Sequence, residues 1–124
     1  MEIALWVVTI LLAAVMLVVG VVKAYQLREK LLTSGIVWIE DFSDNAVKFI
    51  GVAEVLGAIG LTLPAVLDIA PILVPIAAAC LALLMVGAIV VHLRRGERAA
   101  IRMPLALLAA AAFVAFGRFG AWAF

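Results

Sequence analysis

The chain has 124 residues, of which 69% are hydrophobic and 14% are charged, with a formal net charge of +1. Soluble domains are about 45–50% apolar and about 25% charged, so this composition excludes an ordinary water-soluble globule, and the near-zero charge gives no reason to bind nucleic acid. One cysteine and one histidine exclude an intrachain disulfide, a thiolate metal cluster and a bis-histidine haem, so we expect no haem or metal site within the chain.

Four apolar stretches are long enough to cross a bilayer, which takes about 20 residues. They cover residues 3–22, 49–67, 69–91 and 103–124. Spanning segments of this kind form helices, because lipid cannot satisfy the hydrogen bonds of an open strand. We therefore predict an all-α fold, an integral membrane four-helix bundle in a single domain over residues 1–124. Its helices are expected at about 3–27, 46–66, 69–93 and 103–123.

The first apolar stretch is predicted to be a membrane helix and not a cleaved secretory signal. A signal sequence starts with positive charge and ends at a small-residue cleavage site before polar sequence. Here the only charge before the apolar run is the acid Glu2.

The segment between the first two membrane helices is predicted to be a short interfacial element. Residues 25–34 are expected to continue the first helix until Gly35 ends it. The following apolar residues include Trp38 and Phe42, which we expect to dip into the headgroup plane. The alternative is a surface loop with scattered apolar residues.

The second and third helices are predicted to be antiparallel neighbours joined by a very short turn. Pro64 marks the end of the second helix, and Asp68 is expected to cap the start of the third. Pro71 fits a first-turn position, and Pro75 is expected to bend the third helix near its start. Gly96 is expected to end that helix.

Basic residues predict the orientation of the chain. They gather in loops 28–45 and 94–102 and are missing from the N-terminus and the second connection. The positive-inside rule therefore places both loops in the cytoplasm and both termini outside. The expected interfacial aromatic residues are Trp6 and Trp122 at the outer face and Tyr25 and Trp38 at the inner face.

Ionisable residues at membrane depth are costly and usually face the helix bundle. We hypothesise a polar cluster of Lys23, Glu54 and His92 in the inner half of the bundle. Two alternatives stay open: Lys23 as an anchor that snorkels to the headgroups, and His92 as a cation at a helix C-terminus. Small residues that favour close helix packing surround the cluster, namely Gly20, Gly51, Ala53, Gly57 and Gly60.

Arg118 is expected to lie apart from that cluster. It comes fourteen residues after Pro104, about 21 Å from the inner side at helical rise. Burial against the bundle and snorkelling to the outer headgroups beside Trp122 are both consistent with this depth.

The order and spacing of several short motifs resemble the DoxX-like family of small four-helix bacterial membrane proteins. The motifs are Gly20-x-x-Lys23, Gly51-Val52-Ala53-Glu54-x-x-Gly57-x-x-Gly60-Leu61-x-x-Pro64, Pro71-x-x-x-Pro75, Gly87-Ala88, His92-x-Arg94-Arg95-Gly96-Glu97, Pro104 and Gly117-Arg118. The resemblance implies a bacterial inner-membrane location and, for some members, association with quinone-linked redox complexes. Distant relatives use paired cysteines for thiol chemistry, which this chain lacks.

Three functions are compatible with these features. The first is a non-catalytic subunit or accessory of a membrane redox assembly, with lipids and either a protein partner or a second copy as partners. The second is a binding module for a lipophilic molecule such as a quinone or a lipid, and the third is an oligomeric small transporter. An independent enzyme is disfavoured, because no nucleophile–base pair is visible.

Overall fold

The computed structural model describes residues 1–33 and 35–124, and the described part contains helices and no strand. The chain runs through α1 (Glu2–Tyr25), α2 (Arg28–Thr33), the 3₁₀ helix η1 (Val37–Asp41), α3 (Asp44–Val66), α4 (Leu73–Arg94), the 3₁₀ helix η2 (Arg98–Ile101) and α5 (Arg102–Phe119). The predicted all-α fold is confirmed.

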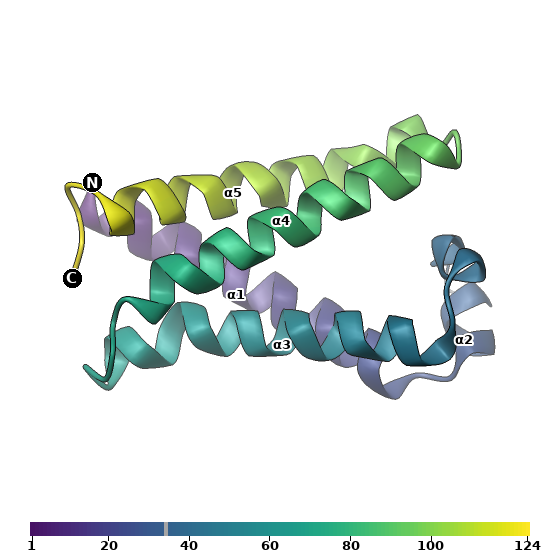
Figure 1. The fold of residues 1–124 in the computed structure, drawn as a ribbon, viewed down its shortest axis with the longest axis horizontal. Coiled ribbons are helices and arrows are strands. Elements are labelled where there is room, and N and C mark those ends of the chain that lie inside the picture. The colour runs from purple at the N-terminus through teal and green to yellow at the C-terminus, as the bar shows by residue number, and fades with distance from the viewer. Residues whose placement is uncertain (34) are drawn as a thin grey trace.

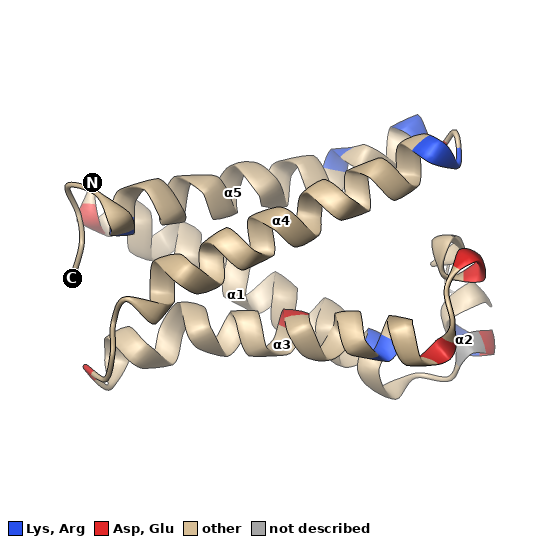
Figure 2. Cartoon of the chain, viewed as in Figure 1, with Lys and Arg blue, Asp and Glu red and all other residues tan. Residues whose placement is uncertain are grey.

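In the described part of the chain, four helical segments are long and apolar enough to cross a membrane: α1, α3, α4 and residues 98–119, which comprise η2 and α5. Large apolar side chains such as Ile10, Phe49, Leu83 and Phe116 point outward on these segments. Figure 2 shows that charged residues gather mainly near the ends of the ribbons. Because lipid, unlike water, accommodates such a surface, the chain is a multi-pass integral membrane protein.

The four long helices form two pairs (Figure 1). Helix α1 packs mainly against α3, and α4 packs mainly against α5. One end of the bundle carries both chain termini and the α3–α4 turn, and we call it the terminal end. The opposite end carries α2, η1 and η2, and we call it the loop end. The two pairs meet toward the terminal end and diverge toward the loop end, where α3 and α4 lie far apart in Figure 1.

Two groups of buried apolar residues hold this arrangement together. The larger group joins all four long helices and includes Met16, Leu61, Leu81 and Val114. The smaller group lies at the loop end and consists of Leu31, Ile39 and Val47, with further apolar residues of the connecting segment packed against it. Apolar packing therefore fastens the segment between α1 and α3 to the bundle.

The prediction that residues 25–34 continue the first helix is wrong for residues 25–33, and residue 34 lies outside the described residues. Helix α1 ends at Tyr25, the backbone is extended at Gln26, and α2 is a separate short helix. Gly35, with φ +92°, then lies in the left-handed region that favours glycine. Trp38 and Phe42 pack edge to face with ring centroids 5.4 Å apart, and both pack against the smaller core group. Contact of this segment with headgroups stays a prediction.

The prediction that Asp68 caps the third helix is also wrong. Asp68 has φ +54° and follows the end of α3, where the N–H of Ile69 donates to the carbonyl of Pro64 at 3.0 Å. This is the hydrogen-bond pattern that closes a helix C-terminus. Helix α4 consequently begins at Leu73 and not at residue 69, which leaves a longer turn than we predicted.

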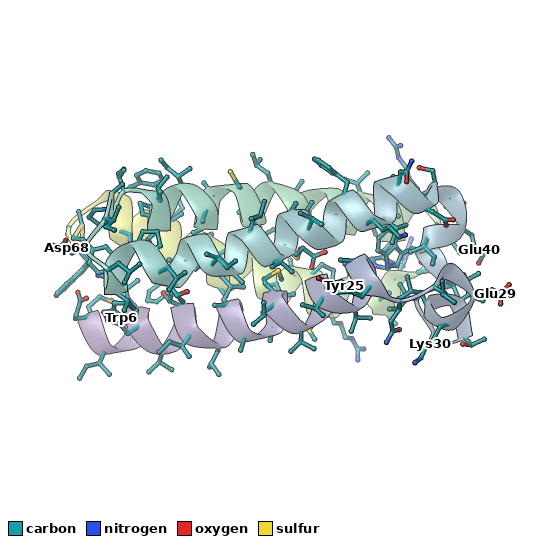
Figure 3. All side chains as sticks on the ribbon, turned by 90° about the horizontal axis from the view of Figure 1, so that it is seen from below. Trp6, Tyr25, Glu29, Lys30, Glu40 and Asp68 are labelled. Carbon is teal, nitrogen blue, oxygen red and sulfur yellow. The ribbon has the colours of Figure 1, made fainter. Side chains whose placement is uncertain are left out.

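Two further helix ends can be compared with the prediction. Gly96 follows α4 with φ +72°, in the left-handed conformation expected of a residue that ends a helix. Helix α5 ends at Phe119, four residues before the predicted end at 123. Figure 3 shows Trp6 and Asp68 at the terminal end, and Glu29, Lys30 and Glu40 at the loop end.

Candidate functional site

A cavity of about 580 Å³ lies between the two helix pairs, in the half of the bundle near the loop end. All four long helices and the segment before α3 contribute to its wall. The lining residues are Met16, Val19, Lys23, Gly35, Ile36, Trp38, Phe42, Ile50, Glu54, Leu83, Leu84, Met85, Gly87, Ala88, Val91, His92, Ala100, Met103, Pro104 and Leu107. Most of these side chains are apolar, and only three carry an ionisable group.

A close backbone contact between α1 and α3 forms one side of the site. A Cβ atom on Gly20 would lie 2.6 Å from the carbonyl oxygen of Gly51, and a Cβ atom on Gly51 would lie 2.7 Å from that of Gly20. Only glycine at both positions allows this approach. In this antiparallel pair the Cβ atom of Glu54 lies 3.0 Å from the Cβ position on Gly20, and that of Lys23 lies 2.9 Å from the Cβ position on Gly51, so the same contact brings the two side chains together.

Lys23 and Glu54 form an ion pair inside the bundle. The Lys23 ammonium donates to Oε1 of Glu54 at 2.6 Å, and the Glu54 side chain is 1% exposed. The Lys23 nitrogen also lies 5.1 Å from the centroid of the Trp38 ring, within the range of a cation–π interaction. The other carboxylate oxygen, Oε2, is buried and has no hydrogen-bond partner among the described residues.

His92 lines the same cavity but does not complete the hypothesised cluster. Its Nδ1 lies 3.0 Å from Glu97, whereas the Glu54 carboxylate pairs with Lys23, so the structure shows a Lys23–Glu54 pair and a separate His92–Glu97 contact in place of one cluster of three. The hydrogen bond from His92, together with Arg95, lowers the pKa of Glu97 below its ordinary value. Arg95 also donates to Asp41 at 2.8 Å, which raises the pKa of the arginine and ties η1 to the end of α4.

Arg118 lies at the terminal end, away from the cavity, and its side chain is buried. It donates to Glu2 at 2.8 Å and to the carbonyl of Trp122 at 2.9 Å, and its guanidinium lies 4.0 Å from the centre of the Phe124 ring. Its Nε and Nη2 have no hydrogen-bond partner among the described residues. Of the two alternatives left open for Arg118, burial is the one observed.

Sequence reasoning missed three partners in these contacts. Glu2 is the only acid near the N-terminus, and the predicted topology already placed it on the same side as Arg118, so this signal was present. Trp38 was expected to point toward the headgroups, and its cation–π contact with Lys23 could not be read from spacing. Glu97 lies five residues after His92, beyond the helix, and the turn at Gly96 brings the two together.

The remaining small residues of α3 are used for packing against α4. A Cβ atom on Gly57 would lie 2.7 Å from the end of the Leu81 side chain, and one on Gly60 would lie 2.9 Å from Cβ of Ala77. Ala53 is partly buried.

In the part of the chain that the structure describes, no group of three histidine, cysteine, aspartate or glutamate residues is arranged to hold a metal ion.

The comparison with known families covers most of the chain. A model of the DoxX-like family matches residues 7–114. The chain belongs to the DoxX-like family. The match includes the cavity and the Lys23–Glu54 pair of this DoxX-like protein, whereas Glu2 and Arg118 lie outside it. No curated protein and no solved structure is significantly similar to the chain.

Proposed function

We propose that this DoxX-like protein binds a lipophilic small molecule in the cavity between its two helix pairs. The observation that carries the proposal is an apolar cavity of about 580 Å³ whose wall contains the buried Glu54, with one carboxylate oxygen unpartnered. Small-molecule sites are typically concave, about 300–1,000 Å³ in volume, and apolar with a few placed polar groups. All three properties are present here.

The charges on the cavity wall favour a neutral ligand. Lys23 and Glu54 neutralise each other, so a charged molecule would enter an apolar cavity without a counter-ion. The ring of Trp38 and the apolar side chains of α4 and α5 supply a surface for the ligand body. Quinones and uncharged or zwitterionic lipids are lipophiles of this kind.

Ligand binding is better supported than a role as an assembly surface. The small residues that suggested an assembly surface pack against other helices of the same chain, because Gly20 and Gly51 contact each other and Gly57 and Gly60 face α4. A partner protein, a second copy of the chain or a transport function therefore has no comparable support. Co-purification from the native membrane reports on the first two.

The experiment is mass spectrometry of the full chain after gentle extraction. We expect the wild-type protein to retain a lipophile, and Ala88→Phe, which adds a ring at the cavity wall, to lose it. The matched control is Ala106→Phe, because Ala106 is exposed on α5 and does not line the cavity. Equal retention by the wild type and Ala88→Phe would refute the proposal.

The orientation of the chain is proposed from its basic residues. We propose that the loop end faces the cytoplasm of a bacterial cell and that both termini face outward, across the inner membrane. The loop end carries Lys30 and the arginine-rich turn after α4, including Arg95 and Arg98. Reporter fusions after residue 96 and at the C-terminus test this, and an outward location of the turn would overturn it.

A further inference from the structure

The cavity wall contains a hydrogen-bond acceptor that the protein itself leaves unused. Oε1 of Glu54 accepts the hydrogen bond from Lys23, whereas Oε2 is buried without a partner among the described residues. A buried carboxylate oxygen that has lost its water and gained no donor is unfavourable, and a donor brought by a ligand would remove that penalty. Glu54 is one of the residues that line the cavity, so a bound ligand would lie next to its side chain.

Lys23 has the opposite requirement, because its ammonium group needs hydrogen-bond acceptors. An ammonium group has three N–H donors and no acceptor, and only one of its hydrogen bonds goes to Glu54. A hydroxyl group both donates one hydrogen bond and accepts others, so one hydroxyl can donate to Glu54 and accept from Lys23. A carbonyl or an ether accepts only, and would satisfy Lys23 while leaving Oε2 unpaired.

Aromatic residues next to the ion pair favour a ring as the carrier of this hydroxyl. Trp38 and Phe42 line the cavity, and their rings already pack edge to face with centroids 5.4 Å apart. Another aromatic ring can join them in stacked or edge-to-face contact. A cationic amine would also donate to Glu54, but it would place a second positive charge beside the Lys23 ammonium.

Resting on the proposed function, we propose that the ligand class is a lipophile with a phenolic hydroxyl, which donates to Oε2 of Glu54. The apolar body of the ligand packs against the cavity wall formed by α4 and α5, and its hydroxyl lies at the Lys23–Glu54 pair. The site then favours a molecule that carries a hydroxyl hydrogen over a molecule of similar shape that lacks it. The hydroxylated, reduced form of a ring is bound in preference to its carbonyl form.

The test uses two probes of nearly identical shape, 4-octylphenol and its methyl ether 4-octylanisole. Binding to the purified full chain in detergent is followed through tryptophan fluorescence, since Trp38 lines the cavity. We expect the phenol to bind at least about tenfold more tightly, as hydrogen bonds to a charged acceptor are worth that factor or more. In Glu54→Gln the preference should fall to about twofold or less while the ether still binds.

A second variant guards against misfolding of Glu54→Gln, which leaves Lys23 without its counter-charge. Lys23→Met combined with Glu54→Leu replaces the whole pair by apolar groups of similar volume, which buried ion pairs often tolerate. This double variant should bind both probes with equal affinity. The cavity-wall variant Ala88→Phe should bind neither.

The outcomes separate this inference from the proposed function. Equal binding of the two probes to the wild type, or tighter binding of the ether, overturns the phenol preference and leaves cavity binding intact. A tenfold preference that persists without the carboxylate also overturns it. Failure of both probes to bind, with retained lipophiles unaffected by Ala88→Phe, overturns both proposals.

Discussion

The contact between Gly20 and Gly51 makes a quantitative prediction for the substitution Gly51→Ala. The added Cβ would lie 2.7 Å from the Gly20 carbonyl oxygen, 2.8 Å from the Ala24 nitrogen and 2.9 Å from Cβ of Lys23. Two of these are backbone atoms, which cannot rotate away. To extend the 2.7 Å contact to 3.4 Å, where ordinary van der Waals contact begins, the helices must separate by about 0.7 Å.

Such a separation would act on both stability and the ion pair. Overpacking of this kind costs about 1–3 kcal/mol. A rigid shift of that size would also lengthen the 2.6 Å Lys23–Glu54 hydrogen bond to about 3.3 Å, at the limit for an N–H···O bond. We therefore expect Gly51→Ala to lower the free energy of unfolding by at least about 1 kcal/mol.

The assay is denaturant unfolding in detergent micelles, followed by circular dichroism, with Gly87→Ala as the matched control. A Cβ atom on Gly87 meets nothing within 4 Å, so the same chemical change should be neutral, or stabilising by up to about 1 kcal/mol through helix propensity. Equal stability of the two variants would refute the close contact on which the site depends.

Three further predictions follow from the other contacts. The pKa of Glu97 is lowered in the folded protein, so its carboxylate contributes fully to stability above the ordinary pKa of 4.5. This contribution is lost as the pH falls through the lowered pKa of the folded state, so Glu97→Gln should make the melting temperature less dependent on pH in the acid range. Arg118→Met should leave thermal stability unchanged or higher, because two guanidinium nitrogens are buried and unpaired, whereas Glu2→Gln should cost more than about 1 kcal/mol, since it leaves the buried Arg118 guanidinium without its counter-charge. Gly57→Ala should cost less than Gly51→Ala in the same unfolding assay, because the atoms it meets are the end of a flexible leucine side chain; an equal cost would contradict that reasoning.

Part of the candidate site could be predicted from the sequence. Glu54 interrupts a long apolar segment, and Lys23 stands at a similar depth in another, so the cost of burying a charge already pointed to a polar cluster that contains both residues. The partners of His92 and Trp38 could not be predicted in this way. The contacts of His92 and Trp38 depend on the direction in which the chain leaves the preceding helix. That direction is set where α1 ends at Gln26 and where α4 is followed by Gly96.

The sequence by itself determined that the chain crosses a membrane in four helices, because runs of about 20 apolar residues leave the backbone only one way to satisfy its hydrogen bonds in lipid. Only the tertiary structure decided that the helices form two diverging pairs and line a cavity beside Glu54. All four helices are apolar on nearly every face, so hydrophobic periodicity says little about which faces meet. Shape complementarity between particular side chains makes that choice, and it exists only once the helices are packed together.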